Sequence, residues 1–373
     1  MRPTKVTVHL EIIVHNIRQM KSRLPKGTKL MAVIKADGYG HGMLQVARAA
    51  IAADADYLGL ATVDEAAELR REGIYAPVLL LGASVPEDAY QMVACDVIET
   101  VWRPDHLGPL AQAARKLGKP ARVHIKVDSG MGRIGLRTKR ELLEMLEYIG
   151  REELIHPDGI YTHFATADEA DPAYRDMQAR RFSELLSVAK GHYPDIMAHA
   201  GNSAIALHAP QYHYDMVRVG YQIYGYDPGP GNSGASFLKP ALEWTTKIAD
   251  IKCLPKGEGV SYGVRYFTAC DTKVATLPVG YADGYRRALT NNGYVLVRGE
   301  RCPIIGTVCM DQCMIDVSHL HDVQIGDDVV LLGGQGEDFI SADEMGRWLS
   351  TIGYEILCGI GRRVPRSYTG LND

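Results

Sequence analysis

The sequence lacks a strong charge of either sign. Its formal net charge is −4 over 373 residues, so no basic field points to nucleic acid as a main partner. No apolar stretch reaches the length of a membrane-spanning helix, and the first residues lack the apolar core of a signal peptide. The seven cysteines are an odd number in a long chain, which indicates reduced thiols. We therefore expect a cytoplasmic globular protein with no membrane partner.

The sequence also lacks the glycine motifs that bind nucleotides. Neither G-x-G-x-x-G after a strand nor G-x-x-x-x-G-K-[ST] occurs, and GYGHG at 38–42 has the wrong spacing. GGQGED at 333–338 falls between β-like runs and predicts a hairpin turn. Cys309 and Cys313 lie near two histidines, but their spacing matches no usual zinc pattern, so we expect no metal.

Short apolar runs and helical patterns alternate through the first two thirds of the chain. The runs are LMAVIK (30–35), YLGLA (57–61), PVLLLG (77–82), DVIETV (96–101), ARVHIKV (121–127), GIYTHF (159–164), IMAHAG (196–201) and MVRVG (216–220). This alternation favours a parallel sheet covered by helices, and eight repeats favour a closed (β/α)₈ barrel.

The pattern changes near residue 230, after the loop-like stretch DPGPGNSG. Short β-like runs separated by turn residues follow, with one amphipathic helix around 341–351. We predict an α/β chain with two domains: an N-terminal (β/α)₈ TIM barrel over 1–230 and a C-terminal all-β domain over 231–373.

Polar residues recur where the predicted barrel strands end. A single lysine at such a place is usually only solvated, but active sites of these barrels lie at the carboxyl ends of the strands. The residues expected to meet there are Lys35, Arg133, His163, Asn202, Ser203, Arg218 and Gly220.

These residue types fit one cofactor. A partly dehydrated lysine can form a Schiff base with a carbonyl. Loops bordered by Ser203 and Gly220 are suited to a phosphate, which barrels often bind after their seventh and eighth strands. A lysine, a carbonyl and a phosphate together indicate pyridoxal 5′-phosphate (PLP).

Nine ordered motifs carry a family resemblance. They are AVIKADGYGHG, KVDSGMGRIGLR, THFATADE, HAGNSA, RVGYQIYG, GVSYG, GYADGYRR, GTVCMDQCMIDV and RRVPR. Together they span roughly residues 4–366 and resemble the PLP-dependent alanine racemases. The resemblance implies a head-to-tail homodimer with shared active sites and a role in making D-alanine for peptidoglycan.

The resemblance also implies a role for each matching residue. Lys35 would hold PLP as a Schiff base, and Tyr262 of the second subunit would be the other acid/base group. The remaining assignments are Tyr39, Ser203, Gly220 and Tyr221 for the phosphate; Arg218, Asn202 and His163 for the pyridine nitrogen; Arg133 for the ring phenolate and substrate carboxylate; and Met310 and Tyr281 for the substrate and the entrance.

Racemisation needs an acid/base group on each face of a planar carbanion. Free tyrosine has a pKa of about 10, so a tyrosine base needs a cationic neighbourhood. Arginine is a poor proton donor, so Arg218 would leave the pyridine nitrogen unprotonated and limit transamination. Lys126 would be an unusual buried lysine, either carbamylated to position Arg133 or paired with Asp128 or another nearby carboxylate.

Three positions depart from the usual family pattern. Thr307 replaces a common arginine, Arg362 replaces a tyrosine before RVPR, and Tyr221 replaces an aliphatic residue. Racemases of the vancomycin-resistance type, which act on serine, also depart at that tyrosine. We therefore expect alanine turnover with greater tolerance of serine than usual.

Four alternatives remain open. A serine or broad-specificity racemase differs only in its substrate. A barrel-type PLP decarboxylase would place an acidic residue where this chain has Arg218. A non-catalytic PLP-binding protein would lack the β domain with VSYG and CMDQ, and a Schiff-base aldolase would not need Tyr262 from a second domain.

Overall fold

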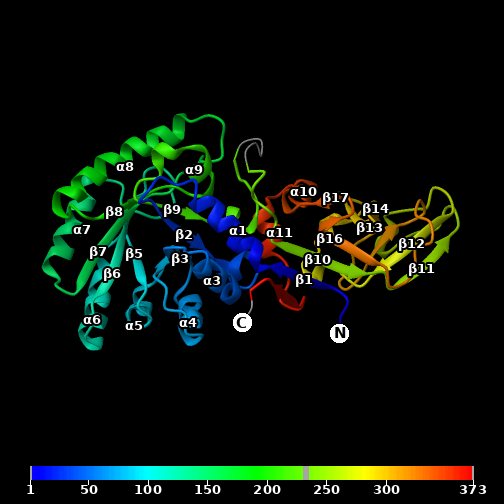
Figure 1. Ribbon diagram of the computed structural model, residues 1–373, viewed down its shortest axis with the longest axis horizontal. Coiled ribbons are helices and arrows are strands. Elements are labelled where there is room, and N and C mark those ends of the chain that lie inside the picture. Colours follow the sequence, from blue (N-terminus) through cyan, green and yellow to red (C-terminus); the bar gives the residue numbers. More distant parts are fainter. Residues whose placement is uncertain (1, 230–234, 372–373) are drawn as a thin grey trace. The chain divides into compact units, whose positions relative to one another are not determined.

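The computed structural model describes residues 2–229 and 235–371 (Figure 1). The chain divides into two compact units, each described here by itself. The barrel unit comprises Ile12–Gly38 and Met43–Lys239, and the β unit comprises Met1–Glu11, Tyr39–Gly42 and Pro240–Asp373. In the part of the chain that is described, no helix is long and apolar enough to span a membrane.

The barrel unit is a closed ring of eight parallel strands, as predicted. Its strands are β2 (Lys29–Val33), β3 (Tyr57–Leu60), β4 (Val78–Leu80), β5 (Ile98–Val101), β6 (Ala121–Lys126), β7 (Ile155–Tyr161), β8 (Met197–His199) and β9 (Met216–Val219). β9 pairs with β2 and closes the ring. Most strand residues are buried because helices cover the outside and side chains fill the inside.

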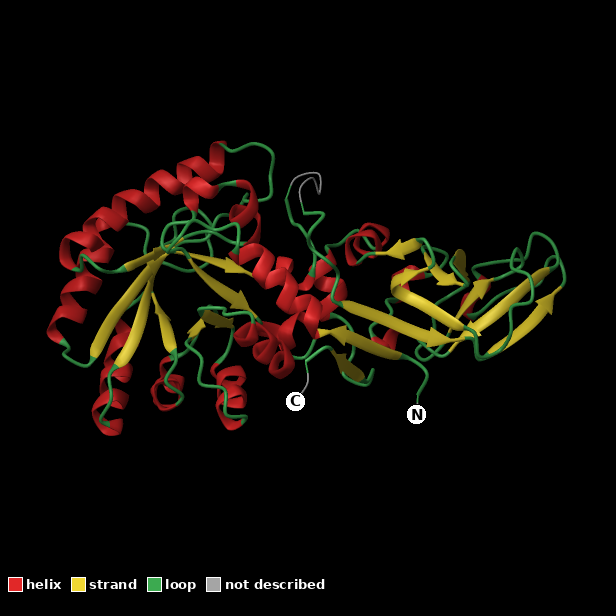
Figure 2. Ribbon diagram, in the orientation of Figure 1, coloured by secondary structure: helices red, strands yellow, loops and turns green. Residues whose placement is uncertain are grey.

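Helices lie on the outer side of these strands (Figure 2). They are α3 (Met43–Ala52), α4 (Val63–Arg71), α5 (Ala89–Ala94), α6 (Leu107–Leu117), α7 (Lys139–Arg151), α8 (Ala173–His192) and α9 (Ser203–His208), with α1 (Leu10–Lys21) beginning in the β unit. Short 3₁₀ helices are η1 (Pro86–Asp88), η2 (Pro104–His106), η3 (Pro210–Tyr212) and η4 (Tyr221–Tyr224).

Helices α4 and α7 show why these segments begin where they do. Each starts with a reciprocal capping box, Thr62 with Glu65 in α4 and Thr138 with Glu141 in α7. The threonine hydroxyl accepts an N–H of the first turn, and the glutamate carboxylate accepts the threonine N–H. Helix α4 therefore begins directly after Thr62.

The β unit is built on a ten-stranded sheet. The strands are β1 (Lys5–His9), β10 (Leu242–Lys247), β11 (Asp250–Leu254), β12 (Thr272–Leu277), β13 (Tyr294–Val297), β14 (Glu300–Ile305), β15 (Cys313–Asp316), β16 (Asp328–Gln335), β17 (Asp338–Ile340) and β18 (Arg366–Thr369). Their order is β11-β12-β15-β14-β13-β16-β10-β1-β18, with β17 on β16 as the predicted hairpin. The helices are α10 (Ala342–Trp348), α11 (Gly353–Cys358), η6 (Tyr262–Val264), η7 (Tyr281–Asp283) and η8 (Arg287–Leu289).

The division of the chain differs from the prediction at its beginning. Strand β1 pairs with β10 and β18, so residues 1–11 belong to the β unit and not to a 1–230 barrel. Its alternating burial suits a sheet with one covered face, unlike the fully buried barrel strands. The boundary predicted between 230 and 231 lies outside the described residues.

Candidate active site

Lys35 lies just beyond the carboxyl end of β2, at the start of α2 (Lys35–Tyr39). Residues Ala36, Asp37 and Gly38 have φ of 53°, 54° and 60°, and Tyr39 continues at 52°. This is one turn of left-handed backbone, which costs an ordinary residue about 1–2 kcal/mol. Such strain persists only where surrounding contacts hold it, and it is typical of functional sites.

A buried hydrogen-bonded chain runs through the barrel interior from Arg218. Arg218 donates to Nδ1 of His163 at 3.0 Å and to Nδ1 of His199 at 2.9 Å. It also donates to the carbonyls of Thr162 and Ala200. The guanidinium is therefore fixed by four acceptors, two of them imidazoles.

The hydrogen-bonded network extends from His199 to a third imidazole, that of His124. His199 and His124 meet at 2.9 Å between Nε2 and Nδ1. Since Arg218 occupies Nδ1 of His199 as a donor, His199 must carry its proton on Nε2 and donate it to His124. An added Cβ at Gly159 would lie 2.6 Å from His124, so this packing requires glycine at 159.

Burial and neighbouring cations keep all three histidines neutral. Burial, followed by the charge of Arg218, holds the pKa of His163 and His199 well below the usual value. Burial and the charge of Arg122 lower the pKa of His124 to about 3. Burial lowers the pKa of Arg218 to about 10, so it stays cationic at neutral pH.

Arg133 and Lys126 add charge to the same region. The loop of Arg133 is held by the Asp128 carboxylate, which accepts the N–H groups of Gly130 at 3.1 Å and Gly132 at 2.9 Å. The charge of Arg133 lowers the pKa of both His163 and Lys126, which places it within electrostatic range of them. Lys35 also lowers the pKa of His163.

Lys126 is buried and donates to the carbonyl of Val127 at 2.6 Å. Its amine lies 5.1 Å from the ring centre of Tyr161, and burial lowers its pKa to about 7. Within the described residues no ion pair joins Lys126 to Asp128, although the charge of Asp128 opposes the lowering of the Lys126 pKa. The strand geometry turns this side chain into the barrel, above Tyr161, rather than toward the loop.

The loops after β8 and β9 meet through a serine. Gly220 donates its N–H to the Ser203 hydroxyl at 3.0 Å, so two residues predicted at the phosphate are adjacent. Asn202 caps α9 by accepting the N–H of Ile205 at 3.2 Å. His199 is a further hydrogen-bond partner of Arg218 that the sequence did not predict.

This donor set suits an anionic phosphorylated carbonyl. Lys35 offers an amine, Ser203 a hydroxyl, and Arg133 and Arg218 offer guanidiniums. In residues 2–229 and 235–371, neither arginine forms an ion pair with a carboxylate, so their charge lacks an anionic complement. The residues at this rim therefore fit PLP.

The β unit brings together another group of predicted residues. Tyr262 lies in η6, and its carbonyl accepts the Thr307 hydroxyl at 2.7 Å. Ser261 donates its hydroxyl to the Thr307 carbonyl at 2.6 Å. Thr307 is buried, whereas 73% of Tyr262 is exposed. Thr307 thus anchors the backbone of an exposed tyrosine.

Met310 and Tyr281 lie on adjoining segments. The backbone N–H of Tyr281 donates to the carbonyl of Cys309, and the N–H of Ala282 donates to the carbonyl of Met310, both at 3.0 Å. Met310 is 53% exposed and Tyr281 40%. These exposed side chains and Tyr262 share one unit, as their common predicted role requires.

Arg362 lies in the segment before β18, in the β unit. It is exposed, and the neighbouring Arg363 instead donates to the buried carboxylate of Asp283 at 2.6 Å. The aromatic residue beside Tyr39 is Tyr354, with ring centres 5.9 Å apart. Burial, helped by Cys358, raises the pKa of the Tyr39 phenol. Tyr354 was not among the predicted residues. It begins the mostly apolar segment YEILC (354–358), and this was the sequence feature that could have pointed to it.

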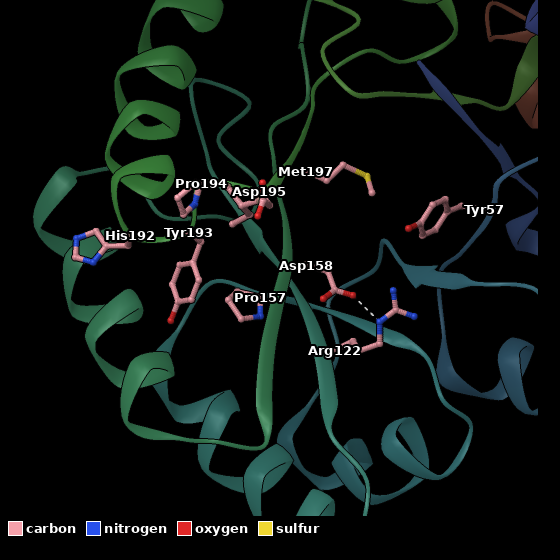
Figure 3. A pocket seen from close by; sticks show the side chains of 10 residues that line it. Tyr57, Arg122, Pro157, Asp158, His192, Tyr193, Pro194, Asp195 and Met197 are labelled. Atoms are coloured by element: carbon pink, nitrogen blue, oxygen red, sulfur yellow. Dashed lines mark hydrogen bonds and ion pairs between the residues drawn. The ribbon is translucent and has the colours of Figure 1, made fainter. Parts of the chain in front are cut away.

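Two pockets differ in whether predicted site residues line them. One of about 410 Å³ lies where barrel strands begin, lined by Tyr57, Arg122, Asp158 and Met197 (Figure 3). That rim is opposite the carboxyl ends where barrels react, and none of the predicted residues line it. The other, about 870 Å³, lies in the β unit and includes Tyr262 and Cys309 in its wall.

The fold and site define a class of protein. Its barrel carries a lysine and a hydrogen-bonded arginine–histidine network toward the carboxyl ends of the strands, and its β unit has an exposed tyrosine. Comparison with known proteins identifies the family. The family model described as alanine racemase, N-terminal domain, matches residues 8–228, and that of the C-terminal domain matches 241–368.

Relatives match over nearly the full length. The alanine racemase of Symbiobacterium thermophilum is 47% identical, covering 99% of this chain and 98% of its own. That of Desulfovibrio desulfuricans is 42% identical, covering 98% of each. The crystal structure of the Bacillus anthracis alanine racemase with bound L-Ala-P has a TM-score of 0.92 at 40% identity, covering 99% and 96%.

The chain therefore belongs to the alanine racemase family. It is accordingly an enzyme of the isomerase class, an alanine racemase.

Proposed function

We propose that this enzyme interconverts L- and D-alanine with PLP, using Lys35 and Tyr262 of a second subunit as the two acid/base groups. The observation that carries the proposal is the buried Arg218, which is held by neutral His163 and His199 and has no carboxylate ion pair among the described residues. This is an arginine prepared to face a polar ligand group.

PLP, when bound, stabilises negative charge on the α-carbon of the amino acid. The residues of the protein would bind the cofactor and substrate and carry the protons. The Lys35 amine would hold the cofactor's carbonyl carbon, and Ser203, Gly220, Tyr221 and Tyr39 would bind its phosphate. Arg218 would donate a hydrogen bond to the pyridine nitrogen without transferring a proton.

Two proton carriers on opposite faces make the reaction reversible. Once the amino acid has displaced its amine, Lys35 would exchange a proton with one face of the α-carbon. Tyr262 would serve the other face, and Arg133 and the Met310 N–H would hold the carboxylate so that the α-carbon stays between them.

The second subunit is part of the proposal. The exposed side chains of the β unit include Tyr262, Met310, Tyr281 and Phe267, the last 61% exposed. Exposed aromatic and methionine side chains are typical of protein interfaces. We propose a homodimer in which each barrel receives Tyr262 from its partner.

Lys126 is proposed to carry a carbamate that positions Arg133. An amine reacts with CO₂ only when neutral, and burial lowers the pKa of Lys126 to about 7, so the neutral form is abundant at pH 8. In ¹³C-bicarbonate, a protein carbamate signal should appear and should be absent from Lys126→Ala.

Alanine is the proposed substrate, and serine tolerance stays a prediction. That expectation came from Arg362, where the family usually has a tyrosine. Chiral chromatography of L-alanine and L-serine reactions separates the two. A cytoplasmic location and a role in peptidoglycan precursor supply complete the proposal, supported by the seven free thiols and by the family.

The direct experiment uses purified protein with PLP. It should be yellow, borohydride should fix the cofactor on Lys35, and L-alanine should become a mixture of both enantiomers. Protein that stays colourless and takes up no PLP would contradict the proposal.

A further inference from the structure

The left-handed turn after Lys35 is bound by one carboxylate from the first turn of α4, the helix that follows β3. Oε1 of Glu65 accepts the N–H of Ala36 at 2.7 Å. That N–H belongs to the peptide group that joins Lys35 to Ala36. The bond therefore fixes the peptide plane next to the lysine.

The other oxygen of Glu65 is used at the same time. Oε2 accepts the N–H groups of Ala61 at 2.8 Å and Thr62 at 3.3 Å, which is the capping-box contact of α4. One side chain thus ties the loop after β3 to the loop after β2. Both oxygens must accept, so an ionised carboxylate is the only side-chain group of this shape that satisfies all three donors.

A second capping box in the same barrel lacks this extra bond. Oε2 of Glu141 accepts the N–H groups of Arg137 at 2.7 Å and Thr138 at 3.0 Å, the same pattern as that of Glu65. The described residues show no bond from Oε1 of Glu141 to another strand's loop. The bond to Ala36 therefore goes beyond what a helix cap requires.

Two other hydrogen bonds involve residues of the turn within the barrel unit. Gly38 donates to the Ile34 carbonyl at 2.9 Å, and the Asp37 carboxylate accepts the Met43 N–H at 2.9 Å. Neither bond reaches the peptide group of Lys35. Ala36 and Asp37 are exposed and have positive φ, so packing does not hold them in this conformation.

We propose that Glu65 is a positioning residue for Lys35: its carboxylate holds the left-handed turn and so aims the lysine amine at the carboxyl-end rim. The proposal rests on the proposed function in one respect, that Lys35 is the lysine that binds PLP. The effect on the turn itself is independent of that function.

The test compares Glu65→Gln with Glu141→Gln in the full-length protein. Glutamine keeps the size of the side chain but replaces one acceptor oxygen by a donor NH₂. At 141, the remaining oxygen can still serve the cap. At 65, the NH₂ group of glutamine would face either the N–H of Ala36 or the N–H groups of the α4 cap, so one of these hydrogen bonds is lost.

Two measurements are made on each variant. The first is amide hydrogen exchange, by mass spectrometry, of peptides covering residues 35–39. The second is the rate at which added PLP becomes fixed to Lys35 by borohydride. We expect Glu65→Gln to speed exchange and slow fixation by roughly tenfold or more, with Glu141→Gln unchanged in both. Melting temperature, measured alongside, reports loss of the cap.

Each outcome decides something. Glu65→Ala, which cannot accept from Ala36 at all, is measured beside Glu141→Ala, and equal exchange in residues 35–39 for these two variants would overturn the proposal. Faster exchange with unchanged fixation would also overturn it, because the turn would then not aim the amine. If wild-type protein took up no PLP, the proposed function would fail, and the exchange comparison would still judge whether Glu65 holds the turn.

Discussion

The carboxyl-end rim of the barrel and the exposed face of the β unit differ in how complete they are. At the rim, Arg218 is buried and has four acceptors from this chain. In the β unit, Tyr262 is 73% exposed, and the Thr307 hydroxyl donates to its backbone carbonyl. Under the proposed function, this difference would mean that one chain prepares the cofactor side of a site and presents Tyr262 for use in a second subunit.

Removing the lysine should have the largest effect. Lys35→Ala should lower racemisation at least roughly a thousandfold, since the amine both binds the cofactor and moves a proton. Borohydride should then label no lysine. Lys29→Ala is the matched control, because Lys29 begins the same strand at the opposite rim. Labelling that persists in Lys35→Ala and is lost in Lys29→Ala would mean that the site is not at the carboxyl end.

Removing the tyrosine hydroxyl should affect turnover and leave cofactor uptake intact. Tyr262→Phe should lower racemisation by about 10²–10⁴-fold, the usual contribution of a general acid/base. PLP absorbance should match that of wild type. Tyr294→Phe, also exposed in the β unit, should behave as wild type in both respects. Normal exchange of the α-hydrogen of both alanine enantiomers by Tyr262→Phe would contradict the two-base mechanism.

The buried, neutral His124 predicts that the stability of the folded protein depends on pH. As pH falls below 6.5, unfolded His124 binds a proton, whereas folded His124 stays neutral until its pKa of about 3. The unfolded state is therefore favoured progressively between pH 6.5 and 3. His124→Gln can still accept the His199 N–H but cannot titrate.

Urea unfolding of wild type and His124→Gln, compared from pH 7 to 4.5, measures this contribution. Below pH 6.5 wild type should lose up to about 1.4 kcal/mol per pH unit relative to the variant. At pH 7 the two proteins should lie within about 1 kcal/mol of each other. Parallel pH profiles would show that His124 is not held neutral.

The smallest effect concerns the anchor of Tyr262. Thr307→Val removes the hydroxyl that donates to the Tyr262 carbonyl and should cost about 1 kcal/mol of stability. Turnover should fall several-fold, with PLP uptake unchanged. Thr272→Val is a control, since its buried hydroxyl donates to the Cys270 carbonyl. Equal turnover in the two variants would show that the anchor does not matter.

The sequence predicted most of the fold because its signals were local. Eight apolar runs, their capping residues and the change near 230 each left a pattern in adjacent residues. The place of β1 was missed because its partners are β10 and β18, far along the chain. The residues of a five-residue strand do not indicate which distant strands it will pair with.

The site was predicted in part for the same reason. Strand-end position predicted the meeting of Arg218 with His163 and of Ser203 with Gly220. His199, Glu65 and Tyr354 were missed because each acts through a contact with a distant segment. Lys126 was recognised as buried, but its partner depends on how the side chain turns inside the barrel.

The most direct test of a site shared by two subunits mixes two inactive variants, Lys35→Ala and Tyr262→Phe. Subunits are dissociated, combined in equal amounts and allowed to reassociate, and alanine racemisation is followed by chiral chromatography. A mixed dimer contains one site with an intact Lys35 and an intact Tyr262, so activity should return to about a quarter of wild type. If both groups came from the same chain, no mixed dimer would have an intact site, and an inactive mixture would contradict the account.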